Sequence, residues 1–251
     1  MHHPARGPVV KVDVLTLFPE WFDWLRRPRH LANAAAVSGL DIRCFNPRDH
    51  TPLGQGQVDD APYGGGPGMV LRVDVMAAAM EAVYAVPAEQ VKDARRVVVL
   101  SPRGRPFDDA VARELAALPA LTLLCGRYEG FDERVHRHLA NDCISLGPFV
   151  LAGGEVAAMA IIDALARRLP GALGNHESLD RESFSPGMAG RVEHPHYTRP
   201  AEFRGWGVPP VLLSGDHAAI EEWRRSQARP APGAGSVLSS PPLSSQEDTP
   251  A

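Results

Sequence analysis

The 251-residue sequence predicts an α/β fold with a mainly parallel sheet and helices on both of its faces. Short β-branched or apolar runs alternate with segments of helical spacing along most of the chain. One run, RRVVVLSP at 95–102, has the continuous apolar character of a strand that is buried on both faces. Three of the runs lead through a glycine or proline loop into a helix, which is how parallel strands are connected.

Five segments are predicted strands. The first, VVKVDVLTLF, alternates and is β-branched, as strand residues often are. The second ends at Pro47, because proline cannot donate to the ladder of a sheet. The predicted strands lie at 9–18, 40–47, 95–102, 120–126 and 142–147.

Six segments are predicted helices. Pro19 suits the first turn of the helix that follows the first strand. The long helix after the last strand places Ile162, Leu165 and Leu169 on one apolar stripe and stops at Gly171. The predicted helices lie at 19–27, 73–86, 107–118, 131–140, 154–171 and 217–228.

Three stretches interrupt this alternation. Residues 48–72 are rich in Gly, Pro and Asp and predict a long loop. Residues from Arg229 onward hold almost no large apolar side chains, so they cannot offset the entropy of ordering and predict disorder. The predicted organisation is a main domain at 9–174, a linker at 175–193, a helical region at 194–228 and a disordered tail at 229–251.

Composition excludes some classes of protein. The formal net charge of −4 does not indicate a large non-specific nucleic-acid surface, although arginine pairs at 26–27, 167–168 and 224–225 are either local basic sites or solvated helix faces. The three cysteines stand far apart without a Cys-x-x-Cys pair, which favours a reduced protein of the cytoplasm. The sequence shows neither a membrane-length apolar run nor a cleavable leader, so we expect no membrane partner.

The three strand–loop–helix segments predict a ligand pocket. In open α/β sheets, ligands bind outside the carboxyl ends of the strands, where these three loops would meet. Gly126 and Gly130 follow the fourth strand and would let backbone groups approach a ligand closely. The alternative is that these glycines only shape a turn.

Common nucleotide and metal signatures are missing. The segment PYGGGPGMVLR lacks the Lys-Ser/Thr of a P-loop, and no Gly-x-Gly-x-x-Gly follows the first strand. The usual AdoMet-binding Rossmann signature is absent too. His194 and His196 have no cysteine or acidic partner after them at a useful spacing, so we predict no metal site.

Two long motifs, DDAPYGGGPGM at 59–69 and CGRYEGFDERV at 125–135, stand in order with five others. The others are LFPEWF, LSPRGRPFD, GPFVLAGGE, ALARRLPGALGN and HYTRPAEFRGWGVPPVLLSGDHAAIEEWRRSQ. Together they resemble the bacterial tRNA (guanine-N1)-methyltransferases of the SPOUT class, over roughly Val9 to Gln227. The resemblance implies a trefoil-knotted domain, a homodimer, S-adenosylmethionine (AdoMet) bound within the knot, and tRNA with guanosine-37 as substrate. It leaves a need for Mg²⁺ open.

The resemblance also assigns residues. Those that would surround the methyl donor are Leu100, Ser101, Pro102, Gly126, Arg127, Tyr128, Glu129, Gly130, Leu146, Gly147, Phe149, Val150, Leu151, Gly153 and Gly154. Those that would lie near the target nucleotide are Asp59, Asp60, Tyr63, Gly64, Gly65, Gly66 and Ser183. For the glycine-rich loop, the alternative is an ordinary mobile surface loop.

The reaction needs a base and a cation, because N1 of guanine carries a proton at neutral pH. The family's arginine matches Arg167, and its aspartate before Ser-Phe matches Glu182, with Asp180 as the alternative base. The sequence departs from the family pattern at Glu182, at Pro148 with Phe149, and in a shortened C-terminal helical region. These departures keep one alternative open, a catalytically degenerate relative that binds tRNA or the donor. An ordinary Rossmann-type nucleotide enzyme is a second alternative.

Overall fold

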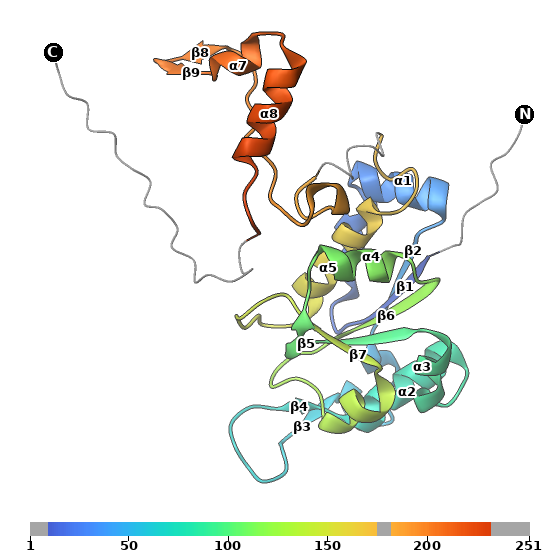
Figure 1. Cartoon of the computed structure of the whole chain (residues 1–251). Helices are drawn as coiled ribbons and strands as arrows, with labels where there is room; N and C mark the ends of the chain where they lie inside the picture. The colour runs from blue at the N-terminus through green and yellow to red at the C-terminus, as the bar shows by residue number, and fades with distance from the viewer. Residues whose placement is uncertain (1–9, 175–181, 232–251) are drawn as a thin grey trace, which may run out of the picture. The chain divides into compact units, whose positions relative to one another are not determined.

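The computed structural model describes residues 10–174 and 182–231. The chain divides into two compact units, one that ends at His176 and another that begins at Glu177. The first unit contains a five-stranded parallel sheet with the order β2-β1-β6-β5-β7 (Figure 1). Its strands are β1 (Lys11–Leu15), β2 (Asp41–Phe45), β5 (Arg96–Pro106), β6 (Ala120–Cys125) and β7 (Asp142–Ser145). All five predicted strands and the predicted parallel sheet are confirmed.

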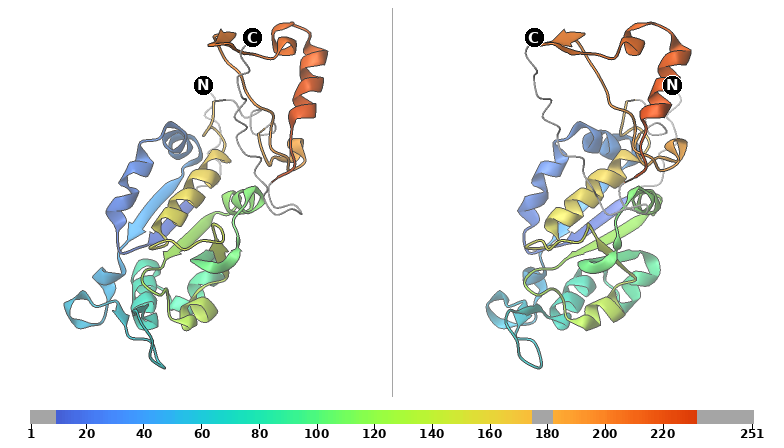
Figure 2. Two further views of the ribbon diagram at one scale, coloured as in Figure 1. Left: turned by 90° about the vertical axis from the view of Figure 1, so that its left-hand side faces the viewer. Right: turned by 60° about the vertical axis from the view of Figure 1, so that its left-hand side comes forward.

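Helices cover both faces of this sheet, as predicted. On one face pack η1 (Pro19–Arg26), α1 (Arg29–Ser38), α4 (Asp109–Ala116) and α5 (Glu155–Arg167). On the other face pack α2 (Val73–Tyr84), α3 (Val91–Ala94) and the π-helix η5 (Val135–Leu139) (Figures 1 and 2). Strand β5 supplies both cores, because Val98 faces the first layer while Val97 and Val99 face the second.

The helices of the first unit differ from the prediction in several places, and the short helix α3 was not predicted. Helix α1 was not predicted; it is short and alanine-rich, and it ends at Gly39, whose φ is +69°. The segment after Pro19 forms a 3-10 helix, and the helix predicted at 131–140 is largely the π-helix η5. Helix α4 begins at Asp109, two residues after the start of the predicted helix, and the Asp108 carboxylate before it accepts a hydrogen bond from the Val111 N–H.

Strand β5 runs four residues beyond its predicted end at Pro102. Its register against β7 shifts between Leu100 and Arg105, so the bulged part still pairs with Ile144 and Ser145. Gly104 makes this close approach possible, because a Cβ at that position would lie 2.5 Å from backbone atoms of Ile144. Sequence pattern alone did not reveal this extension.

Short elements fill the connections of the first unit. They are η2 (Pro47–His50), η3 (Gly54–Gly56), β3 (Asp59–Asp60), β4 (Val70–Leu71) and η4 (Ala88–Gln90). The predicted long loop at 48–72 is therefore interrupted by an antiparallel pair, β3 with β4. No helix within residues 10–174 or 182–231 has the length and hydropathy that a membrane span requires.

The second unit holds η6 (Pro186–Met188), β8 (Glu202–Phe203), β9 (Trp206–Gly207), α7 (Pro210–Leu213) and α8 (His217–Gln227). Helix α8 confirms the helix predicted at 217–228. Arg229, the first residue of the predicted tail, exchanges backbone hydrogen bonds of 2.8 and 3.0 Å with Val192. The rest of that tail from residue 232, and the linker residues 175–181, lie outside the described residues.

Candidate functional site

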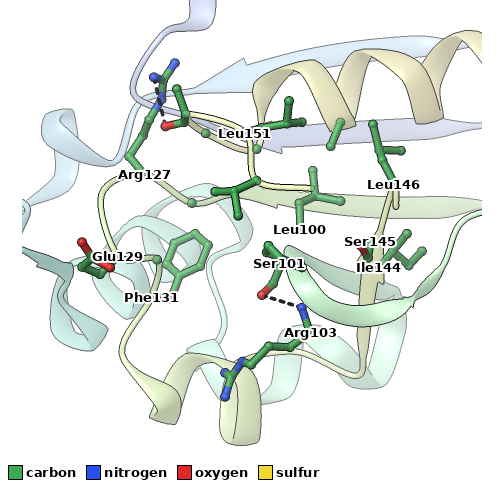
Figure 3. A pocket seen from close by; sticks show the side chains of 18 of the residues that line it. Leu100, Ser101, Arg103, Arg127, Glu129, Phe131, Ile144, Ser145, Leu146 and Leu151 are labelled. Carbon is green, nitrogen blue, oxygen red and sulfur yellow. Dashed lines mark hydrogen bonds between the residues drawn. The ribbon is translucent and has the colours of Figure 1, made fainter. Parts of the chain in front are cut away.

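A cavity of about 440 Å³ opens where β5, β6 and β7 lead into their loops (Figure 3). All the residues predicted to surround the methyl donor line this cavity, except Gly147. They come from 100–102 on β5, from the loop after β6 and from the loop after β7. The structure thus brings the three predicted loops together at one place.

The loop after β6 is a tight turn. The Gly130 N–H donates to the Arg127 carbonyl at 2.9 Å, and Tyr128 and Gly130 both have positive φ angles, of +57° and +100°. At Gly130 the turn itself therefore favours glycine. At Gly126 the reason is different, because an added Cβ would lie 3.2 Å from the Phe131 ring.

The loop after β7 is fastened to this turn by backbone contacts. The Gly154 N–H donates to the Gly126 carbonyl at 2.9 Å, and Arg127 forms an antiparallel bridge with Gly153. A Cβ at Gly154 would lie 2.8 Å from the Cα of Cys125, so only glycine fits at this junction. Backbone atoms, rather than side chains, therefore form this edge of the cavity.

Sequence reasoning missed a polar wall of the cavity, which consists of Arg103, Glu133 and His136. The Arg103 guanidinium pairs with the Glu133 carboxylate at 2.7 Å. Arg103 was missed because it lies on the unforeseen extension of β5. The spacing of Glu133 and His136, three residues apart at the start of a predicted helix, could have placed both on one face.

Burial, and secondarily the charge of Arg103, lower the pKa of His136 below its ordinary value, while Glu133 opposes the shift. The unfolded chain therefore binds this proton more readily than the folded chain does. The free energy of unfolding should fall as pH drops below about 6.5, the ordinary histidine pKa. In His136→Gln we expect a smaller fall between about pH 7 and about pH 5, measured by urea denaturation.

The exposed His138 on the same helix provides a matched control. A His138→Gln variant should keep the pH dependence of the wild-type chain. Equal pH dependence in the wild-type and His136→Gln proteins would contradict the assignment of the shift to His136.

The glycine-rich segment 59–69 is attached to the cavity loop. The Glu129 N–H donates to the Met69 carbonyl at 3.0 Å, and the Leu71 N–H donates to the Gly130 carbonyl at 2.9 Å. From this base the loop between β3 and β4 extends outward, with Tyr63 fully exposed (Figure 1). The residues Asp59, Asp60, Tyr63, Gly64, Gly65 and Gly66 all belong to this hairpin-like segment.

Comparison with known proteins identifies the family. The family model described as tRNA (Guanine-1)-methyltransferase TrmD matches residues 10–231. The chain belongs to this tRNA (guanine-N1)-methyltransferase family. A relative of that name from Dehalococcoides mccartyi is 49% identical over 87% of this chain and 86% of its own length. Others from Sorangium cellulosum and Gloeobacter violaceus are 48% and 49% identical, and the matches cover 89% and 92% of their lengths.

Two arginines, Arg167 and Arg168, stand at the end of α5. The Arg168 guanidinium bonds the Asp109 carboxylate, which Arg113 also bonds. Arg168 thus links α5 to α4 and is engaged in the fold. Arg167, the predicted catalytic arginine, is half-buried in the last turn of α5.

The predicted base belongs to the second unit. Glu182 is half-buried, and its carbonyl accepts a hydrogen bond from the Ser185 N–H at 3.1 Å. The neighbouring Ser183 hydroxyl accepts a hydrogen bond from the Glu193 N–H at 3.1 Å. Residues 182–193 therefore form ordered turns, whereas the alternative base Asp180 lies outside the described residues.

The two histidines that were weighed as a metal site stack against each other in the second unit. The rings of His194 and His196 are 4.7 Å apart, and the His196 Nε2 lies 3.1 Å from a Glu193 carboxylate oxygen. Burial lowers the pKa of His194, and His196 adds to this effect. Residues 10–174 and 182–231 contain no cluster of three or more His, Cys, Asp or Glu side chains arranged to hold a metal.

Proposed function

We propose that this chain transfers a methyl group from S-adenosylmethionine to N1 of guanosine-37 in tRNA, in line with its family. The observation that carries the proposal is the cavity beside β5, β6 and β7. Residues 100–102 of β5 line it together with the loops after β6 and β7, and backbone contacts join these two loops. The curated relatives bear the name tRNA (guanine-N(1)-)-methyltransferase, which supports both the substrate and the position of methylation. The second unit and the loop at 59–69 would hold the tRNA.

The cavity suits a nucleoside-type methyl donor. Its volume of about 440 Å³ is in the range of small-molecule sites. Leu100, Phe131 and Ile144 provide apolar surface for a base, and the glycine edge provides backbone groups for the polar parts. AdoMet, when bound, supplies an electrophilic methyl group on a positively charged sulfur. The remaining chemistry belongs to side chains of this protein.

Two side chains carry that chemistry in our proposal. Glu182 accepts the proton from N1 of guanine, which makes the nitrogen nucleophilic. Arg167 stabilises the negative charge that gathers at O6 as the proton leaves. The resemblance to the family supports Arg167 as the arginine that serves the reaction, because Arg167 matches the family's arginine. No step of the proposed reaction passes through a metal ion.

We also propose a trefoil knot in the domain at 9–174 and a homodimer. The close approach of the extended β5 to β7 at Gly104 and the backbone contacts of the loop after β7 support the knot. Exposed apolar side chains on η1 and α5 support the dimer: Trp24 and Val156 are about half exposed, and the Trp24 indole N–H lies 3.3 Å from the Met159 sulfur. Three free cysteines are consistent with the cytoplasm.

Methyl transfer tests the proposed function directly. Transcripts of one tRNA with G or A at position 37 would be incubated with tritium-labelled AdoMet and the full chain. We expect label in the G transcript alone. Binding of S-adenosylhomocysteine without transfer would instead support the catalytically degenerate relative, and stabilisation by NAD alone would support a Rossmann-type enzyme.

The basic side chains of α8 lead to a prediction for tRNA affinity. Phosphate contacts supply most of the affinity for nucleic acid, and each releases about one counterion. Arg224 and Arg225 of α8 are paired with Glu221 and Glu222, and these carboxylates compete with phosphates for the two guanidinium groups. We expect weak binding with a shallow dependence on salt, measured by filter binding. A slope as steep as about eight released ions would contradict this.

A further inference from the structure

A buried carboxylate lies directly behind the cavity. Glu155, the first residue of α5, has no exposed surface. Its Oε1 accepts a hydrogen bond from the Thr16 hydroxyl at 2.9 Å, and its Oε2 lies 3.0 Å from the Arg127 Nε. A buried charge is costly unless it is paired, so this arrangement depends on Arg127.

The Arg127 side chain is directed away from the cavity. Figure 3 shows its guanidinium extending to the side opposite Leu100 and Ser101. There it stacks over the Phe18 and Trp21 rings, with the guanidinium carbon 4.3 and 4.8 Å from their centres. Only 14% of the side chain is exposed. Charge pairing and stacking thus hold the guanidinium outside the cavity.

The two members of this pair stand at the junction of the donor loops. Arg127 directly follows Gly126, and Glu155 directly follows Gly154, while the Gly154 N–H donates to the Gly126 carbonyl at 2.9 Å. The Arg127 Nη1 also donates to the Ala152 carbonyl at 3.4 Å. The ion pair therefore joins the two glycine loops on the side that does not face the ligand.

We propose that Glu155 and Arg127 form a positioning pair that holds the glycine loops in the shape that binds the methyl donor. The pair acts through the loop backbone, and neither charge contacts the donor. This inference rests on the proposed function, because the donor is the ligand that the loops would hold. It also reassigns Arg127, which the family resemblance placed among the donor-binding residues.

The test compares Glu155→Gln with the wild-type full chain. The amide keeps the shape of the side chain but removes its charge, so the loops lose their common anchor. We expect the Kd for S-adenosylhomocysteine, measured by calorimetry, to rise about tenfold. This change lies within the range of interaction energies between residues in contact. In the methyl-transfer assay, KM for the donor should rise while kcat at saturating donor changes less. Amide hydrogen exchange at 126–130 and 152–154 should become faster.

Asp163→Asn is the matched control. Asp163 lies on the same helix and pairs with His30 at 2.8 Å, but its side chain is 44% exposed and remote from the loops in sequence. This variant should keep wild-type donor affinity and loop exchange. The double variant Arg127→Gln with Glu155→Gln should lose clearly less affinity than the sum of the two single effects predicts, because the charges act as one unit.

Several outcomes would overturn the inference. One such outcome is a Glu155→Gln variant that keeps the wild-type Kd for S-adenosylhomocysteine and the wild-type hydrogen exchange of the loops. Another is full additivity of the two substitutions in the double variant, which would mean that Arg127 contacts the donor itself. If Glu155→Gln does not fold, Thr16→Val removes one hydrogen bond from the same carboxylate and should raise Kd more mildly. If the wild-type chain does not bind S-adenosylhomocysteine, the proposed function fails, and loop exchange alone then decides whether the pair positions the loops.

Discussion

Glu182→Gln is expected to lower the single-turnover rate of methyl transfer by about 10² to 10⁴-fold. Glutamine has nearly the same shape but cannot accept the N1 proton, so the guanine remains a poor nucleophile. The measurement is rapid-quench incorporation of labelled methyl into tRNA at saturating enzyme and donor. Because the substitution removes a proton acceptor for guanine and no group that the proposal assigns to the donor, the affinity for S-adenosylhomocysteine should be unchanged.

Asp180→Asn is the control for this prediction, since Asp180 is the other acid considered as the base. It should keep most of the activity. If Asp180→Asn loses activity while Glu182→Gln retains it, the assignment of Glu182 is wrong and Asp180 takes its place.

Glu182→Asp provides a finer test of geometry. Members of the family resembled by the sequence carry aspartate before the Ser-Phe pair, so this substitution shortens the side chain toward that pattern. A displacement of about 1 Å can cost about a hundredfold in rate. We expect Glu182→Asp to retain far more activity than Glu182→Gln, because the proton acceptor is kept. Equal loss in both variants would mean that position 182 serves the structure rather than proton transfer.

The fold was predictable because its strands carry strong local signals. The apolar run at 97–100 requires burial on both faces, and the structure places its alternate side chains in two separate cores. Helix α1 gave a weak signal, since its buried residues are only Leu31, Ala34 and Ser38, and a single large apolar side chain among them does not mark a helical stripe. The π-helix η5 could not be distinguished from an α-helix, because both have similar spacing over so short a segment.

The candidate site was predictable where glycines mark it and not where tertiary contacts make it. Gly126, Gly130 and Gly154 pointed to the loops that the structure joins at the cavity. Arg103 was missed because its position depends on the bulged pairing of β5 with β7, which needs a contact with Ile144, a residue distant in sequence. The direction of the Arg127 side chain was likewise set by Phe18 and Glu155, residues that sequence spacing does not connect to it.

Asp13 shows how an alternating pattern can conceal a buried charge. Lys11 and Asp13 alternate with Val12 and Val14, as in a strand with one solvated face. In the structure Asp13 is fully buried, and both of its oxygens are bonded by Arg43 at 2.9 and 3.1 Å. A central strand of a parallel sheet has no solvated face, so a carboxylate there requires cationic partners.

Asp13→Asn is therefore expected to lower the free energy of unfolding by about 3–5 kcal/mol. Arg95 is the main reason: its Nη1 lies 2.7 Å from Asp13, and its side chain is only 10% exposed. The Tyr84 hydroxyl donates to the same carboxylate at 3.1 Å, and the Arg95 guanidinium lies over the Tyr84 ring. Removing the carboxylate leaves a buried guanidinium without its counter-charge, a loss that urea denaturation at neutral pH would measure.

Asp41→Asn separates this effect from a general loss of negative charge. Asp41 lies 3.9 Å from the same Arg43, but its side chain is 51% exposed, so water replaces the lost partner. Its substitution should change the free energy of unfolding by less than about 1 kcal/mol. If both variants lose the same free energy of unfolding, burial does not explain the contribution of Asp13 to stability. A large loss at Asp13 alone would mean that the sheet depends on a charge network that joins β1, β2 and the start of β5.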